Sequence, residues 1–82
     1  MIDEKNKTIH GVQLRPRQHK LVSYIITRPN ELITRQEILD AVWGKDTLVK
    51  AAVIDVHLSQ IRRLIPELKI FTRSGFGFTY VP

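Results

Sequence analysis

A helical apolar periodicity in residues 49–65 constrains the fold of this chain more than any other feature. Isoleucine or leucine recurs there at i, i+4, i+7 and i+11, at Ile54, Leu58, Ile61 and Ile65. This spacing aligns one apolar edge of an α-helix. The pattern predicts a helix over about 51–65 that packs against the rest of the chain and is closed by Pro66.

The opposite face of this helix is small and rich in hydrogen-bonding groups. At about 100° per residue, that face carries Ala52, Val56, Ser59, Gln60 and Arg63, with Arg62 on its flank. A solvated face would usually be full of Glu and Lys, whereas the only acid in this stretch is Asp55. The face is typical of a helix that is pressed against a partner.

The composition narrows the class of that partner. The chain has 82 residues, enough for one domain with a single small core. It has no cysteine, which excludes disulfides and thiolate metal sites. A net charge of +5 and a pI near 10 favour a polyanionic partner, although many small proteins are basic for solubility alone. Because no apolar run is long enough to cross a bilayer and no secretory signal opens the chain, we expect a cytoplasmic location.

The first half of the chain predicts short strands followed by two helices. Residues 1–14 read as two or three short strands around a polar turn at 4–7. A helix over about 16–27 begins at Pro16 and carries an apolar stripe of Leu21, Tyr24 and Ile25, with Arg17, Lys20 and Ser23 turned outward. Leu32 and Ile33 form a brief apolar bridge. Thr34 and Glu37 then form a capping box for a helix over about 35–43, which Gly44 ends.

The second half predicts a polar loop over 44–50, the long helix and a C-terminal β-hairpin. The stretches 68–72 and 77–81 alternate and are rich in β-branched and aromatic residues, with a glycine-containing turn at 73–76. The expected fold class is α+β, a winged helix-turn-helix with an N-terminal β-hairpin, three helices and a C-terminal hairpin wing. Residues 1–82 form one domain.

This arrangement suits a helix that reads double-stranded DNA in the major groove. Gln60 can bond adenine through both amide atoms, and Val56 can meet a thymine methyl. Arg62 and Arg63 suit guanine or phosphate, and Arg73 at the wing suits a narrow minor groove. The full set of expected DNA contacts is Val56, Ser59, Gln60, Arg62, Arg63, Arg73, Lys50, Val53, Trp43, Thr72, His57 and Thr34.

Five blocks of the sequence resemble the OmpR/PhoB-type family of winged-helix effector domains. The blocks are Leu14-Arg-Pro-Arg-Gln, Pro29-Asn-Glu-Leu-Ile-Thr-Arg-Gln-Glu-Ile-Leu, Val42-Trp43-Gly44, Ile54-Asp-Val-His-Leu-Ser-Gln-Ile-Arg-Arg and Thr72-Arg-Ser-Gly-Phe-Gly-Phe. The resemblance implies a bacterial transcription regulator that binds DNA through the third helix and the wing. It also implies that the loop 44–50 meets RNA polymerase or a neighbouring subunit, and that the domain binds as a dimer or in tandem.

The chain departs from the family pattern at several contact positions. Family members often carry Arg-Thr where this chain has Ala52-Val53, and an arginine where it has Gln60. The arginine that usually precedes the first wing glycine is replaced by Ser74, and Arg73 stands one position earlier. The family's arginine contacts therefore cannot be carried over as a set.

The chain begins at Met1, as in the ToxR/CadC-like subgroup, whose winged helix is N-terminal. From this we expect the N-terminal part of a longer chain, such as the cytoplasmic domain of a membrane-anchored regulator.

The two alternatives to DNA binding are an enzyme and a protein-binding module. An enzyme is not expected, because His10, His19 and His57 are scattered and Glu37 and Asp40 are explained by capping and solvation. We likewise expect no cofactor, no metal and no small-molecule substrate. A winged helix used only for protein contacts stays open, since small outer residues such as Ala52, Val53 and Val56 would also suit a helix-in-groove interface.

Overall fold

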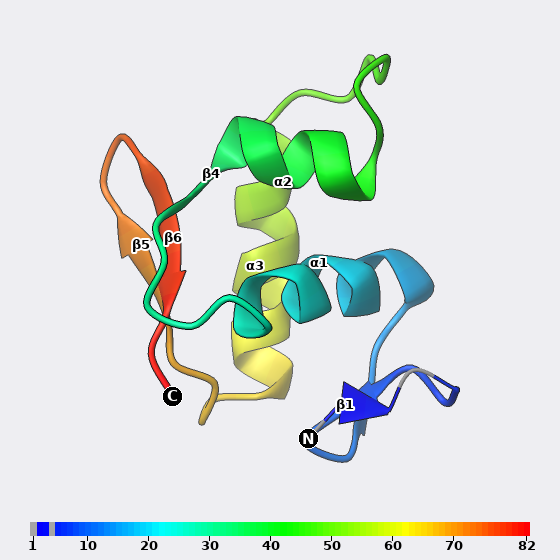
Figure 1. The fold of residues 1–82 in the computed structure, drawn as a ribbon. Helices are drawn as coiled ribbons and strands as arrows, with labels where there is room; N and C mark the ends of the chain where they lie inside the picture. Colours follow the sequence, from blue (N-terminus) through cyan, green and yellow to red (C-terminus); the bar gives the residue numbers. More distant parts are fainter. Residues whose placement is uncertain (1, 4) are drawn as a thin grey trace.

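Three helices form the centre of the molecule. The computed structural model describes residues 2–3 and 5–82. The helices are α1 (Pro16–Ile26), α2 (Arg35–Val42) and α3 (Ala52–Leu64), and each begins and ends within one residue of its expected position. α1 and α2 lie on the same side of α3, which passes behind both of them in Figure 1.

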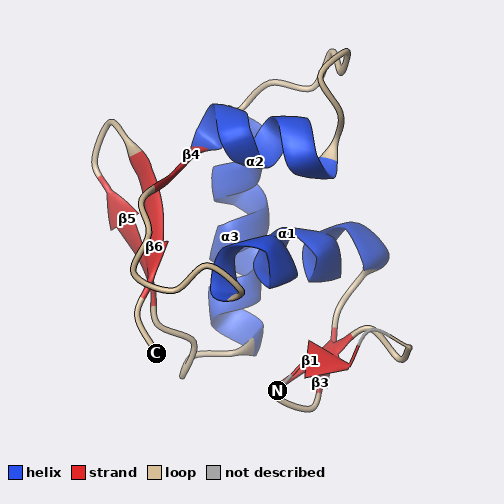
Figure 2. Cartoon of the chain, in the orientation of Figure 1, coloured by secondary structure: helices blue, strands red, loops and turns tan. Residues whose placement is uncertain are grey.

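Two small antiparallel sheets flank the helices (Figure 2). The N-terminal sheet consists of β1 (Ile2–Asp3), β2 (Thr8–Ile9) and β3 (Val12–Gln13), in that order. It confirms the expected short strands, although the parts of that expectation that concern Met1 and Glu4 lie outside the described residues. The C-terminal sheet consists of β5 (Ile70–Arg73) and β6 (Gly77–Tyr80), which pair as the expected hairpin, and of a third strand, β4 (Ile33–Thr34).

The strand β4 was not predicted from the sequence, which assigns Ile33 to a brief apolar bridge between two helices. Ile33 and Thr34 pair with Phe78 and Gly77, so β6 is the central strand in the order β4-β6-β5. Two residues are too few to show an alternating pattern, and their partner lies more than forty positions away. The pairing anchors the C-terminal hairpin to the start of α2 instead of leaving it free-standing.

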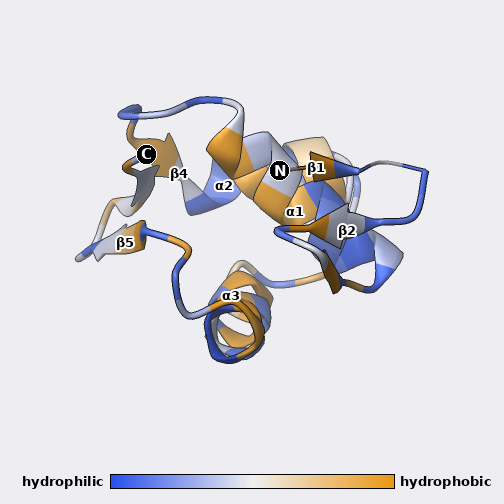
Figure 3. Cartoon of the chain, turned by 90° about the horizontal axis from the view of Figure 1, so that it is seen from below, coloured by the Kyte–Doolittle hydropathy of each residue, from blue (hydrophilic) through white to orange (hydrophobic). Residues whose placement is uncertain are grey.

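The predicted apolar edge of α3 is the centre of the core. Ile54, Leu58, Ile61 and Ile65 are all fully buried. They pack in one cluster with buried residues of α1, α2 and β6, including Phe78. Figure 3 views α3 nearly end-on and shows hydrophobic and hydrophilic residues on different sides of the helix. The orientation of α3 inferred from periodicity is confirmed.

The buried face of α1 is wider than the predicted stripe. Val22 is fully buried, and Gln18 and His19 are also buried, whereas Tyr24 is only partly so. The expectation that Ser23 points outward is wrong, because its hydroxyl is buried. α1 contacts both α2 and β6, and a helix covered by several elements must bury more than one stripe.

One half of the predicted capping box is present. The Thr34 hydroxyl accepts a hydrogen bond from the backbone N–H of Glu37 at 3.1 Å, as expected for an N-cap. The Glu37 carboxylate instead accepts a hydrogen bond from the Tyr24 hydroxyl at 2.8 Å. This bond raises the pKa of Tyr24. Glu37 therefore links α2 to α1 by a side-chain contact.

Candidate nucleic-acid interface

The outer face of α3 is open to solvent along its length. Ala52, Val56, Ser59, Gln60 and Arg63 are all exposed, and Val56 is 56% exposed despite its apolar side chain. One shallow depression on this face is lined by Asp55, Val56, Ser59, Gln60 and Arg63. A second is lined by Arg15, Gln18, Gln60, Arg63 and Leu64. Because Gln60 and Arg63 line both depressions, these two side chains lie at the middle of the exposed surface.

The amide of Gln60 is held by a residue of α1. The Nε2 of Gln18 donates a hydrogen bond to the Oε1 of Gln60 at 2.9 Å. The same Nε2 lies 3.5 Å from the Nδ1 of His57. The carbonyl end of Gln60 is therefore already engaged within the protein.

Trp43 and His57 belong to a packed cluster at the junction of the three helices. The rings of Trp43 and His57 lie 5.7 Å apart with an interplanar angle of 38°. The guanidinium of Arg17 lies 5.2 Å from the Trp43 ring centroid and donates a hydrogen bond to the carbonyl of Val42 at 3.4 Å. Both rings are half-buried, so His57, an expected DNA contact, packs against Trp43 at the edge of the exposed face of α3.

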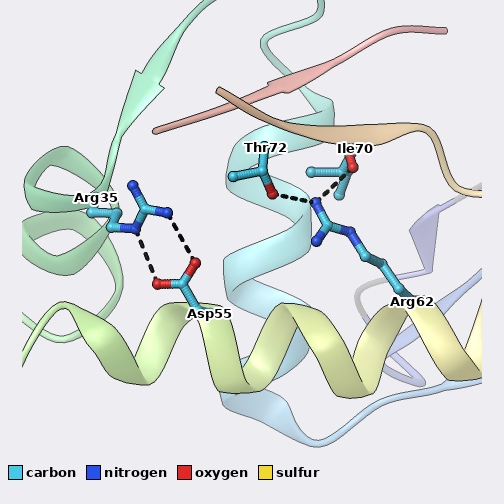
Figure 4. A network of polar contacts seen from close by, with 5 residues as sticks. All are labelled: Arg35, Asp55, Arg62, Ile70 and Thr72. Atoms are coloured by element: carbon cyan, nitrogen blue, oxygen red, sulfur yellow. Dashed lines mark hydrogen bonds and ion pairs between the residues drawn. The ribbon is translucent and has the colours of Figure 1, made fainter. Parts of the chain in front are cut away.

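Arg62 joins α3 to β5. Its NH2 donates hydrogen bonds to the carbonyl of Ile70 at 2.7 Å and to the hydroxyl of Thr72 at 3.1 Å (Figure 4). Arg62 and Thr72, both among the expected DNA contacts, are thus bonded to each other. Arg63, one position further, is exposed and makes no hydrogen bond or ion pair with the described residues.

Asp55, the only acid of α3, is paired with Arg35 at the start of α2. Arg35 donates from Nε and NH2 to the two carboxylate oxygens, each at 3.0 Å (Figure 4). The hydrogen bond from Arg35 lowers the pKa of Asp55, and the same contact raises the pKa of Arg35. Arg35 was not predicted as a residue of this site. The available signal was Asp55, a single acid on an otherwise neutral or basic face, which needs a cationic partner.

The wing carries an exposed arginine and an exposed aromatic residue. Arg73 is the last residue of β5 and pairs with Gly77. The turn between the strands is closed by a hydrogen bond from the N–H of Phe76 to the carbonyl of Arg73 at 2.9 Å. Phe76 is 68% exposed at the tip of the hairpin and was missed in the sequence. The available sequence signal was a phenylalanine between two glycines, Gly75 and Gly77, at the predicted turn.

The remaining expected contacts lie at element ends. Lys50 is exposed just before α3, and its carbonyl accepts a hydrogen bond from the N–H of Val53 at 3.1 Å. Val53 is half-buried and packs against the core. Thr34 is exposed, with its hydroxyl engaged as the N-cap of α2. Among the residues that the structure describes, no three His, Cys, Asp or Glu side chains gather as metal ligands do.

The described helices are all too short or too polar to cross a membrane. Three helices, with the exposed third helix followed by a hairpin, define a winged-helix domain. The family model described as "Transcriptional regulatory protein, C terminal" matches residues 8–80. The chain belongs to this family, the OmpR/PhoB-type winged-helix domains, and is the DNA-binding domain of a bacterial transcription regulator and not an enzyme.

Individual relatives agree with this assignment. The chain is 33% identical over 85 residues to the uncharacterized transcriptional regulatory protein YkoG of Bacillus subtilis, covering 94% of this chain and 37% of YkoG. It is 31% identical to the DNA-binding domain of Bacillus subtilis CssR, with a TM-score of 0.80 and coverage of 85% and 80%. The DNA-binding domain of Escherichia coli CadC shares the fold, with a TM-score of 0.84, 22% identity and coverage of 100% and 86%. The chain spans about a third of the length of the curated relatives it matches.

Proposed function

We propose that the chain binds double-stranded DNA sequence-specifically, with α3 in the major groove and the β5–β6 hairpin against the minor groove. The observation that carries the proposal is the open, uncharged centre of α3, where Val56, Ser59 and Gln60 are exposed beside Arg63. The RstA domain of Klebsiella pneumoniae, described in complex with its RstA box, supports the geometry through its shared fold (TM-score 0.74, 19% identity, coverage of 87% and 75%).

In this proposal some residues contact bases, others contact the DNA backbone or minor groove, and a third group supports α3 from within the protein. Val56, Ser59 and Gln60 face base edges, because they are exposed side chains at the centre of α3. Arg63 beside them contacts a phosphate. Lys50, Arg73 and Thr34 lie at exposed element ends and contact the DNA backbone or minor groove. Five further residues line the edges of the interface and keep α3 in place through their internal contacts: Arg62, Thr72, Trp43, His57 and Val53.

Salt dependence tests DNA binding against a purely protein-binding module. The affinity for duplex DNA should fall steeply with salt, with a slope of about −0.9 for each phosphate contact in a plot of log affinity against log salt concentration. Fluorescence anisotropy with a selected duplex at several salt concentrations measures this slope. An absence of binding to any duplex at low salt would overturn the proposal and leave the protein-binding alternative on the small outer residues of α3.

A contact with RNA polymerase or a neighbouring subunit is proposed for the loop 44–50. Leu48 in this loop is 98% exposed, and Lys45 and Asp46 beside it are exposed as well. Leu48→Ser should leave the affinity for DNA unchanged and lower transcription from a target promoter in vitro. Dimeric or tandem binding is tested separately, by counting bound chains on one and on two repeats of the selected site.

The chain is further proposed to be one domain of a longer, cytoplasmic regulator. The response regulator SaeR of Staphylococcus aureus, 36% identical over 76 residues, supports a response-regulator-type protein. The fold shared with the CadC domain supports a ToxR/CadC-like one. The reading frame around residues 1–82 decides between them. A receiver domain before this domain fits the first class, and a membrane segment after it fits the second.

A further inference from the structure

We infer that Gln18 is a positioning residue that determines which atom of Gln60 faces the DNA. The inference rests on the proposed function, since it assumes that the outer face of α3 lies in the major groove. It concerns a residue outside α3 that touches no base itself.

The contacts that carry the inference come from one buried amide. Gln18 lies in the first part of α1 and is only 5% exposed, whereas Gln60 is exposed. The Nε2 of Gln18 donates to the Oε1 of Gln60 at 2.9 Å and lies 3.5 Å from the Nδ1 of His57. An amide nitrogen has two hydrogens, so it can also donate to His57 in the tautomer that carries its ring hydrogen on Nε2.

The bond to Gln60 sets the orientation of the Gln18 amide. Reversing the Gln18 amide alone would place its oxygen against the Oε1 of Gln60, which costs this hydrogen bond. The His57 ring on the other side of Gln18 packs 5.7 Å from the Trp43 ring, and the guanidinium of Arg17 lies 5.2 Å from the Trp43 ring centroid.

The consequence for DNA reading follows from the groups on each base edge. With Oε1 bonded to Gln18, Gln60 has its Nε2–H groups left for the groove. In the major groove, guanine presents two acceptors, adenine presents one acceptor and one donor, and cytosine presents a donor. A two-point contact with adenine needs both atoms of the Gln60 amide on the groove side, whereas the bond to Gln18 draws the Oε1 toward α1. The bond from Gln18 therefore favours guanine over adenine at this position and disfavours cytosine.

Selection of bound duplexes from a randomised pool tests the inference with the wild type, three single variants and one double variant. Gln60→Ala identifies the base pair that Gln60 reads, as the position at which the preference of the wild type is lost. At that position the wild type should prefer guanine. Gln18→Leu removes the bond and frees the whole amide, so the ratio of adenine to guanine should rise by about tenfold, the usual scale of a two-point contact.

Gln18→Glu is the matched variant that should reverse the orientation of the Gln60 amide. A carboxylate only accepts hydrogen bonds, so it should bond the Nε2 of Gln60 and turn the Oε1 toward the groove. The preference should then move toward cytosine. Thermal unfolding of each variant separates loss of folding from change of preference, and adding Gln18→Leu to Gln60→Ala should have no further effect on the base preference.

The two possible failures are distinguishable. If the wild type selects no sequence from the pool, the proposed function fails. If the wild type selects a sequence and folded Gln18→Leu and Gln18→Glu keep its preference at the Gln60 position, the positioning role of Gln18 is overturned while the proposed function stands.

Discussion

Arg35 and Asp55 form a two-point ion pair that ties the start of α2 to the first turn of α3. Both hydrogen bonds measure 3.0 Å, and the Arg35 guanidinium also lies 4.7 Å from the ring centroid of Phe78 in β6. Arg35 therefore links α2 to both α3 and β6. Since Asp55 is the only acid of α3, the pair also neutralises the one charge on this helix that would repel DNA.

The pair should make stability depend on pH. Asp55→Asn is expected to lower the free energy of unfolding by about 1 kcal/mol near neutral pH, the upper end for a partly exposed pair. The Arg35 hydrogen bond lowers the pKa of Asp55 below its ordinary value of 3.8. The contribution is therefore complete above about pH 4 and is lost as the pH falls through the lowered pKa of the folded state. Urea unfolding between about pH 7 and pH 2.5 measures the difference between wild type and variant.

Asp46→Asn is the matched control for this experiment. Asp46 is exposed in the loop before α3 and makes no side-chain hydrogen bond or ion pair with the described residues. Its replacement should change stability by less than about 0.5 kcal/mol at every pH. A gap between wild type and Asp55→Asn that stays constant down to the lowest pH would contradict the assigned role of the pair.

The neighbouring arginines of α3 should have separable effects. Arg62→Ala is expected to lower the free energy of unfolding by about 1–2 kcal/mol, because it removes charge-assisted hydrogen bonds to Ile70 and Thr72. Arg63→Ala should change stability by less than about 0.5 kcal/mol. It should instead reduce the salt slope of DNA binding by about 1, as expected for one lost phosphate contact.

Urea unfolding and anisotropy titrations on both variants give the comparison. Each arginine serves as the control for the other, since they are adjacent in sequence and carry the same charge. If Arg62→Ala reduces the salt slope as much as Arg63→Ala and leaves stability unchanged, then Arg62 contacts a phosphate and its bonds to Ile70 and Thr72 do not stabilise the fold.

Much of α3 could be predicted because its structure is recorded in a local pattern. The spacing of Ile54, Leu58 and Ile61 fixes which edge is buried, and the exposed positions Val56 and Gln60 follow from the same 3.6-residue period. The terminal hairpin is equally local, since its strands alternate and its turn contains glycine. These features need no knowledge of how the elements cross.

Contacts between distant residues could not be predicted in this way. Gln18 and Gln60 are 42 positions apart, and Arg35 and Asp55 are 20 apart. Their meeting depends on the angles at which α1 and α2 pack on α3, which no single helix encodes. The contacts of Arg62 with Ile70 and Thr72 could not be predicted either, because they depend on where the chain turns after Pro66 to form β5.

The pairing of β4 with β6 depends on Gly77. A Cβ at this position would overlap the carbonyl oxygen of Ile33 and would lie 2.9 Å from the Cα of Thr34, and the backbone φ is +155°. Neither neighbour can move without breaking the sheet. Gly77→Ala is therefore expected to lower the free energy of unfolding by about 3 kcal/mol, as measured by urea unfolding.

Gly75 provides the control within the same hairpin. Its φ of +78° is also positive, but a Cβ there would meet nothing within 4 Å. Gly75→Ala should cost only the strain of the left-handed backbone, about 1 kcal/mol. Equal losses for the two variants would show that the backbone angle, and not the close approach of β4, requires glycine at position 77.

Arg73 should distinguish minor-groove binding by the wing from simple phosphate contact. It is exposed at the end of β5, beside the turn that Phe76 closes. A·T-rich DNA has a narrower and more negative minor groove, which attracts an inserted arginine. Arg73→Ala should therefore weaken binding by about tenfold more on A·T-rich than on G·C-rich flanks, whereas Lys50→Ala, which removes a backbone contact, should weaken both equally. Anisotropy titrations with the same central site and exchanged flanks measure this. Equal losses on both flanks for Arg73→Ala would place its side chain on a phosphate and leave the wing tip outside the groove.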